Sequence, residues 1–410
     1  MKLARFMPAL TAVGLILMAC GGSTPGTTTT ATVPSDLSVT SFDSSFSYMS
    51  KLKSLTAAGK GMVGVILPDT TSSTRYVDFD APYLTQAFQA AGYSASQFKI
   101  DNAQGSDQSE LALAQADITA GATVLVMDPL NSTVGSQIQA LAAQKGVKLI
   151  SYDRATFTGN NTYYVSFDNV QVGKLIGQGF LDCTKAWNVT SPKVFTLDGG
   201  TDSDPNAISF AQGYNQVVWG STTVPQPAGK TNTQGMTLVG EQTAPGWSNT
   251  QGATIFQQQF TAHKEINATI QANDGLGNAV VQVLKNSGVK ANTIPTTGQD
   301  ATLAGMANVL TGFQCGSVYK AVYLEAQAAV ALATVLRANA TPPTALVNGK
   351  TSPPTGTTGN TQPAVLLTPV WVTKTNMAST VIKDGFVKGS ALCGQVGAAV
   401  CQANNIPSTP

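Results

Sequence analysis

Short apolar stretches alternate with segments of helical periodicity along most of the chain. The first, GMVGVIL at 61–67, is predicted to form a buried strand, and Leu84, Ala87 and Phe88 follow it at the spacing of one helix face. Further strands are predicted at 97–101, 122–128, 147–153 and 162–167. Because helical segments separate most of these strands, the connections are βαβ crossovers and the sheet is parallel.

The same alternation starts again in the second half of the chain, after a helix with Val172, Leu175 and Ile176 on one face. Strands are predicted at 192–200, 236–242, 268–274, 292–300 and 316–320, with helices at 206–218, 250–262, 276–287 and 302–311. A long helix at 321–340, a Pro/Gly/Thr-rich loop at 341–363 and a last strand at 366–374 follow. The pattern predicts an α/β protein of two lobes, each a parallel sheet flanked by helices.

The N-terminus has the layout of an export signal. Lys2 and Arg5 precede an apolar stretch that is too short to span a bilayer comfortably, and small residues follow. Leu17 to Cys20 resemble the lipobox of bacterial lipoproteins, although a plain signal peptide is the alternative. We therefore expect a lipoprotein signal peptide at 1–19, lipidation of Cys20 and, from its Thr, Ser and Gly content, a flexible tether at 20–58.

The overall composition limits the classes of function that this chain can have. Of 410 residues, 42% are hydrophobic, which is enough for two cores. The net charge of +1 gives no electrostatic reason to expect nucleic acid as a partner. The single histidine, His263, lies in the polar stretch TAHKEI and is expected at the surface, so a multi-histidine metal site is excluded. We expect neither a metal nor a cofactor.

Apart from Cys20, the cysteines are Cys183, Cys315, Cys393 and Cys401. An even number in an exported protein indicates disulfides, and four cysteines allow three pairings. Cys393 and Cys401 are close in the sequence, so a bridge between them forms most easily and leaves Cys183 for Cys315. The sequence does not decide the pairing. None of the four belongs to a C-x-x-C motif, which indicates a structural role.

Polar residues collect where the predicted strands end. They occur in PDTTSSTRY (68–76), ISYDR (150–154), LDGGTDSDPNA (197–207), QANDGLG (271–277) and TGQDATLAG (297–305). In an open parallel sheet, ligands bind outside the carboxyl ends of the strands. These segments supply Asp, Asn and Arg but no evident nucleophile with its base. The pattern therefore indicates binding through hydrogen bonds and not an enzyme.

A monosaccharide suits this set of side chains. Carboxylates and amides accept hydrogen bonds from hydroxyls, cations donate to them, and an aromatic ring such as that of Trp247 covers an apolar sugar face. A glycosidase would need two carboxylates, which are conceivable among Asp202, Asp204, Asp274 and Asp300. A calcium loop, suggested by the spacing of Asp202, Asp204 and Asn206, fails because Ala207 stands where glycine is required.

Several segments together carry a more specific resemblance. They are GMVGVIL, LISYDR, YVSFDNVQVGKL, GGTDSDPNA, QANDG, TGQDATLAGM, VYKAV and LLTPVWVTKTNMASTVIKDGF. Over about residues 61–391, and in this order, the chain resembles the xylose-binding proteins of bacterial ABC sugar import, within the ribose and galactose periplasmic-binding family (type I). The resemblance implies two Rossmann-like lobes that close on one sugar, with hinge crossings near 166–168, 319–320 and 368–369.

The resemblance also implies a set of sugar-contacting residues. Asp153 and Arg154 match the paired Asp-Arg of the family, and Arg75 matches an arginine after the first strand. Tyr76 stands where the xylose-binding proteins carry tryptophan. The other matching positions are Asp204, Asn206, Trp247, Asn273, Asp300 and Lys320, with Phe167, Asp274 and Gln299 adjacent. Alternatively, Asn273 and Asp300 cap helices, Lys320 is a solvated charge and Trp247 packs within its lobe.

These observations predict an extracytoplasmic, lipid-anchored solute-binding protein. It is expected to capture a monosaccharide, with D-xylose favoured, as a monomer and to deliver it to an ABC permease. The alternatives are a sensor that reports to a membrane receptor and a binding protein for another monosaccharide. The expected N-terminal lobe comprises residues 60–167 and 321–368, the C-terminal lobe 168–320 and 369–391, and a tail 392–410.

Overall fold

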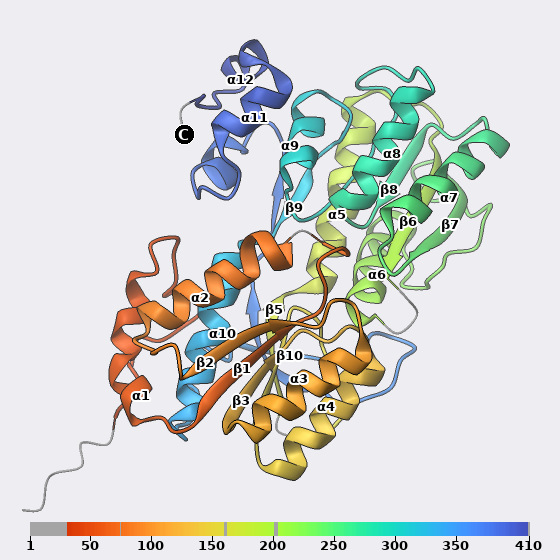
Figure 1. Cartoon of the computed structure of the whole chain (residues 1–410). Helices are drawn as coiled ribbons and strands as arrows, with labels where there is room; N and C mark the ends of the chain where they lie inside the picture. Colours follow the sequence, from red (N-terminus) through yellow and green to blue (C-terminus); the bar gives the residue numbers. More distant parts are fainter. Residues whose placement is uncertain (1–30, 74, 160–161, 201–203, 409–410) are drawn as a thin grey trace, which may run out of the picture. The chain divides into compact units, whose positions relative to one another are not determined.

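The computed structural model describes residues 31–73, 75–159, 162–200 and 204–408 (Figure 1). The predicted signal peptide at 1–19 and the predicted lipidation site, Cys20, lie outside the described residues, as does Asp202. Within the described ranges, no helix is long and apolar enough to cross a membrane.

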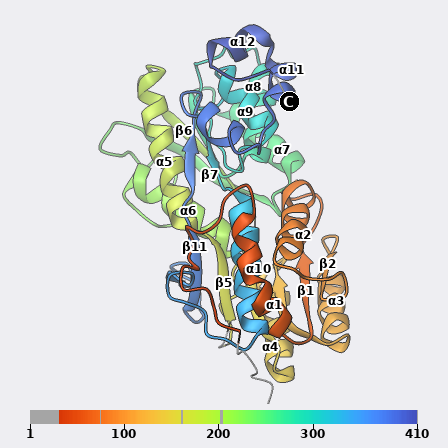
Figure 2. The same cartoon turned by 90° about the vertical axis from the view of Figure 1, so that its left-hand side faces the viewer.

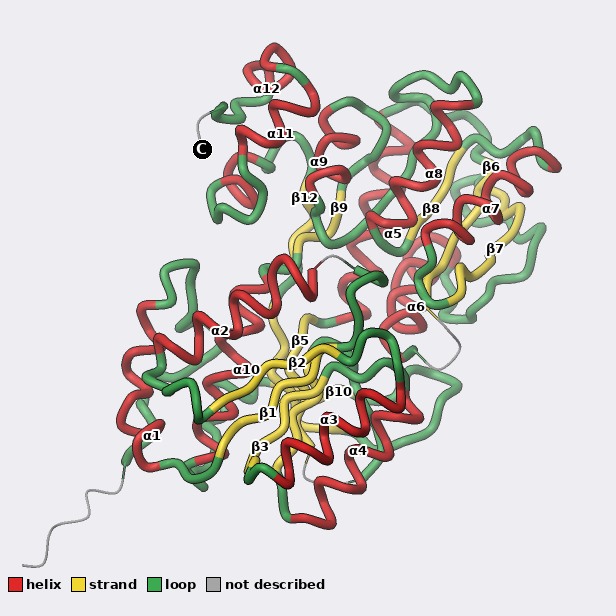
Figure 3. Tube along the Cα trace, in the orientation of Figure 1, coloured by secondary structure: helices red, strands yellow, loops and turns green. Residues whose placement is uncertain are grey.

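The first lobe, here called the N-terminal lobe, is built on a seven-stranded sheet of order β10-β11-β5-β4-β3-β1-β2. In Figure 3 the yellow strands β1, β2 and β3 of this sheet lie together. Every neighbouring pair is parallel except β10 with β11. The strands are β1 (Met62–Leu67), β2 (Phe98–Asn102), β3 (Ala122–Met127), β4 (Lys148–Tyr152), β5 (Thr162–Phe167), β10 (Gly349–Thr351) and β11 (Gln362–Leu367).

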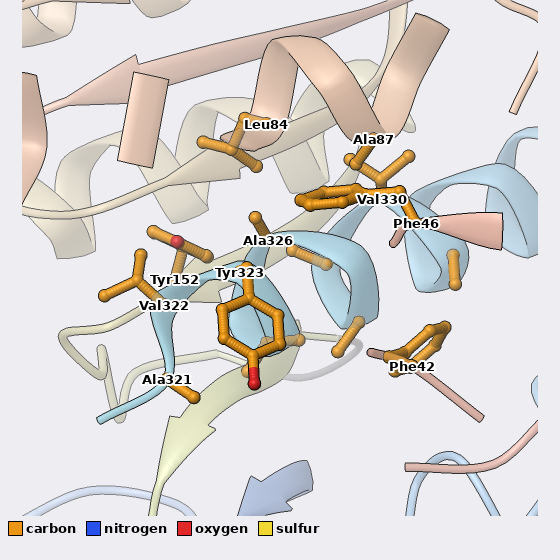
Figure 4. Packing of buried hydrophobic residues seen from close by; sticks show 14 of the residues in the cluster. Phe42, Phe46, Leu84, Ala87, Tyr152, Ala321, Val322, Tyr323, Ala326 and Val330 are labelled. Atoms are coloured by element: carbon orange, nitrogen blue, oxygen red, sulfur yellow. The ribbon is translucent and has the colours of Figure 1, made fainter. Parts of the chain in front are cut away.

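Helices cover both faces of this sheet. They are η2 (Tyr76–Asp80), α2 (Ala81–Ala90), α3 (Asp107–Thr119), α4 (Ser132–Lys145) and α10 (Val322–Arg337). Along β1, Val65 packs with α2 and α10, whereas the next residue, Ile66, packs with α3 and α4. Figure 4 shows Leu84 of α2 near Ala326 of α10 in the first of these clusters. A parallel sheet buried on both faces explains its nearly continuous apolar strands.

The second lobe, here called the C-terminal lobe, has a parallel three-stranded sheet, β7-β6-β8, and an antiparallel pair, β12-β9. The strands are β6 (Lys193–Gly200), β7 (Thr237–Pro245), β8 (Ala268–Gln271), β9 (Ser317–Tyr319) and β12 (Val370–Val372). The helices are α5 (Asn169–Ala186), α6 (Pro205–Trp219), α7 (Asn249–Ala262), α8 (Asp274–Asn286) and α9 (Leu303–Leu310). The chain passes between the two lobes after β5, after β9 and after β11.

The interpretation of residues 20–58 as a flexible tether is wrong for its described part. Residues 47–58 form η1 (Ser47–Leu52) and α1 (Lys53–Ala58), and α1 lies beside α10 (Figure 2). The large apolar side chains of this segment join the core of the N-terminal lobe: Leu37, Phe42, Phe46, Met49, Leu52 and Leu55. The abundance of Ser and Thr concealed these apolar positions, which recur every three to five residues.

Two further details differ from the predicted elements. Residues 292–300 form no continuous strand; only Gln299 makes an isolated bridge, with Val318. The last predicted strand is divided by Thr368 and Pro369 into β11 and β12, which belong to different lobes. Beyond η3 (Ala378–Ile382), the chain ends in α11 (Gly389–Val396) and α12 (Ala398–Ala403). The disulfides are Cys183–Cys315 and Cys393–Cys401.

Candidate ligand-binding site

A cavity with about 350 Å³ of empty space, here called the ligand pocket, lies among side chains from both lobes. All ten residues that the sequence suggested as ligand contacts line it: Arg75, Tyr76, Asp153, Arg154, Asp204, Asn206, Trp247, Asn273, Asp300 and Lys320. Ser72, Ser73, Phe210 and Gln299 complete the lining.

The strand ends explain why residues so far apart in the sequence meet. Asp153 and Arg154 come directly after β4, and Lys320 directly after β9. Asp204 and Asn273 are the N-cap residues of α6 and α8, which follow β6 and β8. Because each side chain stands at the carboxyl end of its strand, the two lobes present their polar edges to one another across the pocket.

Asp153 is held by cations from both lobes. Its Oδ1 accepts a hydrogen bond of 2.9 Å from Nη1 of Arg75 and lies 3.8 Å from Nζ of Lys320, while Oδ2 accepts one from the Tyr76 hydroxyl at 3.0 Å. Burial opposes its charge, but the charges of Arg75, Lys320 and Arg154 outweigh burial and hold the pKa of Asp153 below its usual range. Its backbone is left-handed, with φ 54°, an unusual conformation for a residue other than glycine.

Three buried carboxyl groups accept hydrogen bonds from Arg75. Nε and Nη2 donate to Asp80 at 2.8 and 2.7 Å, Nη2 also donates to Glu325 at 2.7 Å, and Nη1 donates to Asp153. A guanidinium has five N–H groups. The described residues thus accept from four of them, and the fifth, on Nη1, is available to a ligand. Burial raises the pKa of Glu325 to about 8, against the lowering effect of Arg75.

Arg154 also lies near the Tyr76 ring. Its guanidinium carbon is 5.4 Å from the ring centroid, and that of Arg75 is 5.6 Å from it. Arg154 donates to Oγ of Ser72 at 3.2 Å, and its Nε lies 3.9 Å from the buried Asp128 carboxylate. Both oxygens of Asp128 accept no hydrogen bond from the described residues. Both guanidinium groups thus lie close to the Tyr76 ring, whose hydroxyl donates to Asp153.

Asn206 joins the two lobes, whereas Asp204 is engaged within the C-terminal lobe. Oδ1 of Asp204 accepts from the backbone N–H groups of Asn206 and Ala207, which caps α6, and Oδ2 accepts from Nε1 of Trp247 at 2.8 Å. Nδ2 of Asn206 donates to the carbonyl oxygen of Asp153 at 2.9 Å. Both oxygens of Asp204 are thus engaged within the lobe, so the residue serves mainly to orient the indole of Trp247.

Asn273 and Asp300 offer polar groups to the pocket. Oδ1 of Asn273 caps α8 through the N–H of Leu276, which leaves its amide N–H groups for a ligand. Oδ1 of Asp300 is buried and accepts no hydrogen bond from the described residues, although Nζ of Lys320 lies 3.3 Å away. Asp300 and Ala301 have φ values of 88° and 46°. Such left-handed residues cost about 1–3 kcal/mol each and cluster at functional sites.

The residues adjacent to the predicted contacts have different places. Gln299 lines the pocket, whereas Phe167 packs in the core of the C-terminal lobe. Asp274 is buried and does not line the pocket; it accepts hydrogen bonds from Thr302, Gln314 and Ser317. Burial raises the pKa of Asp274 to about 7. Its role in the structure is therefore to fix the start of α9 beside Asp300.

Asp80 and Glu325 were not identified from the sequence. Glu325 is the only acidic residue in the Ala- and Leu-rich helix α10, and this isolated charge in a buried helix was the signal that could have found it. Asp80 offered no such signal. In the described ranges, no group of three or more His, Cys, Asp or Glu side chains is placed to hold a metal ion. His263 lies at the surface beside Glu265.

A family model described as a periplasmic binding protein domain matches residues 63–340. The chain belongs to the periplasmic binding protein family. Among curated relatives of this periplasmic binding protein, the D-xylose-binding periplasmic protein of Escherichia coli is 32% identical over 301 residues, which cover 72% of this chain and 82% of the relative. The multiple sugar-binding periplasmic receptor ChvE of Rhizobium radiobacter is 30% identical, over 82% of this chain and 93% of the relative.

Solved structures show the same fold. A carbohydrate transporter solute-binding protein from Chloroflexus aurantiacus, crystallised with D-glucose, has a TM-score of 0.67 and 26% identity, covering 80% of this chain and 97% of the other. A protein from Mycobacterium smegmatis in complex with β-D-fucofuranose has a TM-score of 0.64 at 17% identity, over 82% of this chain and 98% of the other. The predicted fold, a type I periplasmic binding protein with helix-flanked parallel sheets, is confirmed.

Proposed function

We propose that this periplasmic binding protein captures a monosaccharide, with D-xylose the favoured ligand, and delivers it to an ABC permease. The observation that carries the proposal is the convergence of all ten suggested contact residues, from both lobes, on one pocket. The names of its relatives agree in kind, since they include proteins for D-xylose and for several sugars. No group in the pocket is proposed to be catalytic.

The free hydrogen-bonding groups match a polyhydroxylated ring. Oδ1 of Asp300 accepts from a hydroxyl, whereas the remaining N–H of Arg75, the amide of Asn273 and the ammonium of Lys320 donate to hydroxyl oxygens. Hydrogen bonds to such charged groups contribute about 1.5–3 kcal/mol each. The rings of Trp247, Phe210 and Tyr76 supply apolar surface for the C–H faces of the sugar.

Binding is proposed to proceed by closure of the lobes. Arg75, Asp153 and Arg154 belong to the N-terminal lobe, and Asn273 and Asp300 to the C-terminal lobe, so only the closed arrangement offers both sets to one sugar. Periplasmic binding proteins are a standard example of such hinge closure. The sugar shifts the equilibrium because its affinity for the closed form exceeds that for the open form. The proposed hinges are the three crossings, near Asp168, Lys320 and Pro369.

Calorimetric titration of residues 31–410 with D-xylose, ribose, arabinose, glucose and galactose tests the proposal. We expect one-to-one binding, with D-xylose tightest. Binding of another monosaccharide in preference would keep the transport role and point to Tyr76, the departure from the xylose-binding pattern. If no sugar in the panel binds, the proposal is wrong. Incubation with aryl glycosides serves as the control for catalysis, and we expect no release of the aryl group.

Attachment to the membrane through lipidated Cys20 is part of the proposal and rests on the sequence alone. Metabolic labelling with a radioactive fatty acid should mark the wild-type chain expressed in bacteria and leave the Cys20→Ala chain unlabelled. Equal labelling of both chains would refute this site. Delivery to a permease is tested by sugar uptake in the source cell, which should be lost when the gene for the binding protein is deleted.

A further inference from the structure

A second and larger cavity, here called the outer cavity, adjoins the ligand pocket. Ser72, Ser73, Asn273 and Asp300 line both. The outer cavity has about 1210 Å³ of empty space, part of it open to solvent, compared with about 350 Å³ in the ligand pocket. The two cavities therefore meet at these four side chains.

The apolar wall of the outer cavity comes from three parts of the chain. Phe79 belongs to η2, Leu303 begins α9, and Phe386 and Val387 precede α11. The rings of Phe79 and Phe386 stack with their centroids 4.1 Å apart. The N-terminal lobe and residues 386–403, here called the C-terminal segment, thus build this wall together. Stacked aromatic side chains present C–H and π surface that suits the apolar face of a ring.

The C-terminal segment supplies a fixed side to the cavity. Ala391 and Gln395 of α11 line it, and α11 lies beside α9 (Figure 1). Cys393 is joined to Cys401, and Leu392 is fully buried, so α11 is anchored in the core. This segment lies beyond residues 63–340, the part of the chain that the family model matches. The outer cavity thus depends on structure that the matched domain does not include.

The polar residues of the outer cavity favour a neutral ligand. Asn249, Asn278 and Gln395 contribute amides, which both donate to and accept from hydroxyls. Asp78 and Lys388 carry opposite charges, so they add no net charge. A phosphate would meet one ammonium, Lys388, against the carboxylates of Asp78 and Asp300. Apolar surface with neutral amides suits a second sugar ring better than an anion.

We propose that the outer cavity binds the second ring of a disaccharide whose first ring occupies the ligand pocket, so that the protein captures small disaccharides as well as monosaccharides. This inference rests on the proposed monosaccharide site. The apolar wall contacts the C–H face of the second ring, and the amides of Asn249, Asn278 and Gln395 bind its hydroxyls.

The test compares D-xylose with its β-1,4-linked disaccharide by calorimetric titration of residues 31–410. Ala391→Trp places a large side chain in the outer cavity from an exposed position of α11, and Ala304→Trp does so from α9. Ala399→Trp is the matched control, because Ala399 is exposed on α12 and lines neither cavity. Each variant is first compared with the wild type by thermal melting. Ala391→Trp and Ala304→Trp are the filling variants, and Ala304→Trp replaces Ala391→Trp if Ala391→Trp does not fold.

We expect the wild type and Ala399→Trp to bind the disaccharide within about tenfold of the monosaccharide, a difference of about 1.4 kcal/mol. The filling variants should lose at least tenfold in disaccharide affinity and keep monosaccharide affinity within twofold. Monosaccharide binding without disaccharide binding would overturn the inference and leave the proposed function intact. Equal disaccharide affinity in the filled and wild-type chains would also overturn it. Absence of binding for both sugars would overturn D-xylose as the favoured ligand together with this inference.

Discussion

Arg75 and Asp80 form a buried ion pair joined by two parallel hydrogen bonds, with Nε 2.8 Å and Nη2 2.7 Å from the two carboxylate oxygens. Asp80 has no exposed surface, and the hydroxyl of Tyr152 also donates to it. A bidentate pair fixes the plane of the guanidinium as well as its position. Asp80 therefore sets the direction in which the remaining N–H of Arg75 points into the ligand pocket.

Replacing Asp80 by Asn should lower both stability and sugar affinity. Breaking a buried pair leaves an uncompensated charge and costs roughly 3–5 kcal/mol; the remaining bonds of Arg75 to Asp153 and Glu325 place the expected loss toward the lower value. Urea unfolding measures it. Asp78→Asn is the control, since Asp78 is exposed on the same short helix. Equal stability of the two variants would show that the pair contributes nothing.

Asp300→Asn should weaken sugar binding at least tenfold while the melting temperature without sugar changes little. The amide keeps the shape of the side chain and tolerates the left-handed backbone at φ 88°, but it removes the charged acceptor. Calorimetric titration gives the affinity. Asp182→Asn, an exposed position on α5, serves as the control. Unchanged affinity in Asp300→Asn would remove this residue from the set of ligand contacts.

Stability should fall as the pH rises from about 5 to 8. Burial raises the pKa of Glu110 to about 8, from 4.5, with the N–H of Leu130 opposing it, and burial also raises the pKa of Glu325 to about 8. Between the ordinary glutamate pKa of 4.5 and the raised pKa of about 8, the folded chain holds protons that the unfolded chain has released. The free energy of unfolding therefore decreases as the pH rises, and it levels off above about pH 8. Asp153, with its lowered pKa, affects stability only at more acidic pH.

Glu110→Gln isolates one part of this effect. The amide cannot ionise, so the variant should lose less stability than the wild type between pH 5 and pH 8. Urea unfolding at several pH values, at constant ionic strength, gives the two slopes. Identical slopes would mean that Glu110 ionises in the folded chain as it does in the unfolded one.

A chain that begins at Lys60 should melt well below a chain that begins at Ala31. The shorter chain lacks the six large apolar side chains that residues 37–55 bury in the N-terminal lobe. Full burial of one such side chain contributes about 1.5–3 kcal/mol. Differential scanning calorimetry of the two chains measures the difference. Equal melting temperatures would restore the interpretation of this segment as a tether.

The sequence by itself determined the fold class. Alternation of apolar strands with helical faces, as in residues 61–91, is imposed by a sheet that is covered on both sides, so the period of the pattern shows directly what each segment becomes. The positions of the candidate ligand residues could also be predicted from the sequence, because polar side chains at the carboxyl ends of parallel strands converge at one edge of the sheet. Their identity as a set came from the resemblance to a known family.

Only the tertiary structure decided which of these side chains are free to meet a ligand. The sequence shows Asp204 and Asp300 as equivalent carboxylates, yet one is occupied by α6 and Trp247 while the other keeps a buried oxygen without a hydrogen bond. The tertiary structure also placed the large apolar side chains between Leu37 and Leu55 in the core, and it built the outer cavity against α11. These features depend on contacts between residues far apart in the chain, which the local periodicity of a sequence does not encode.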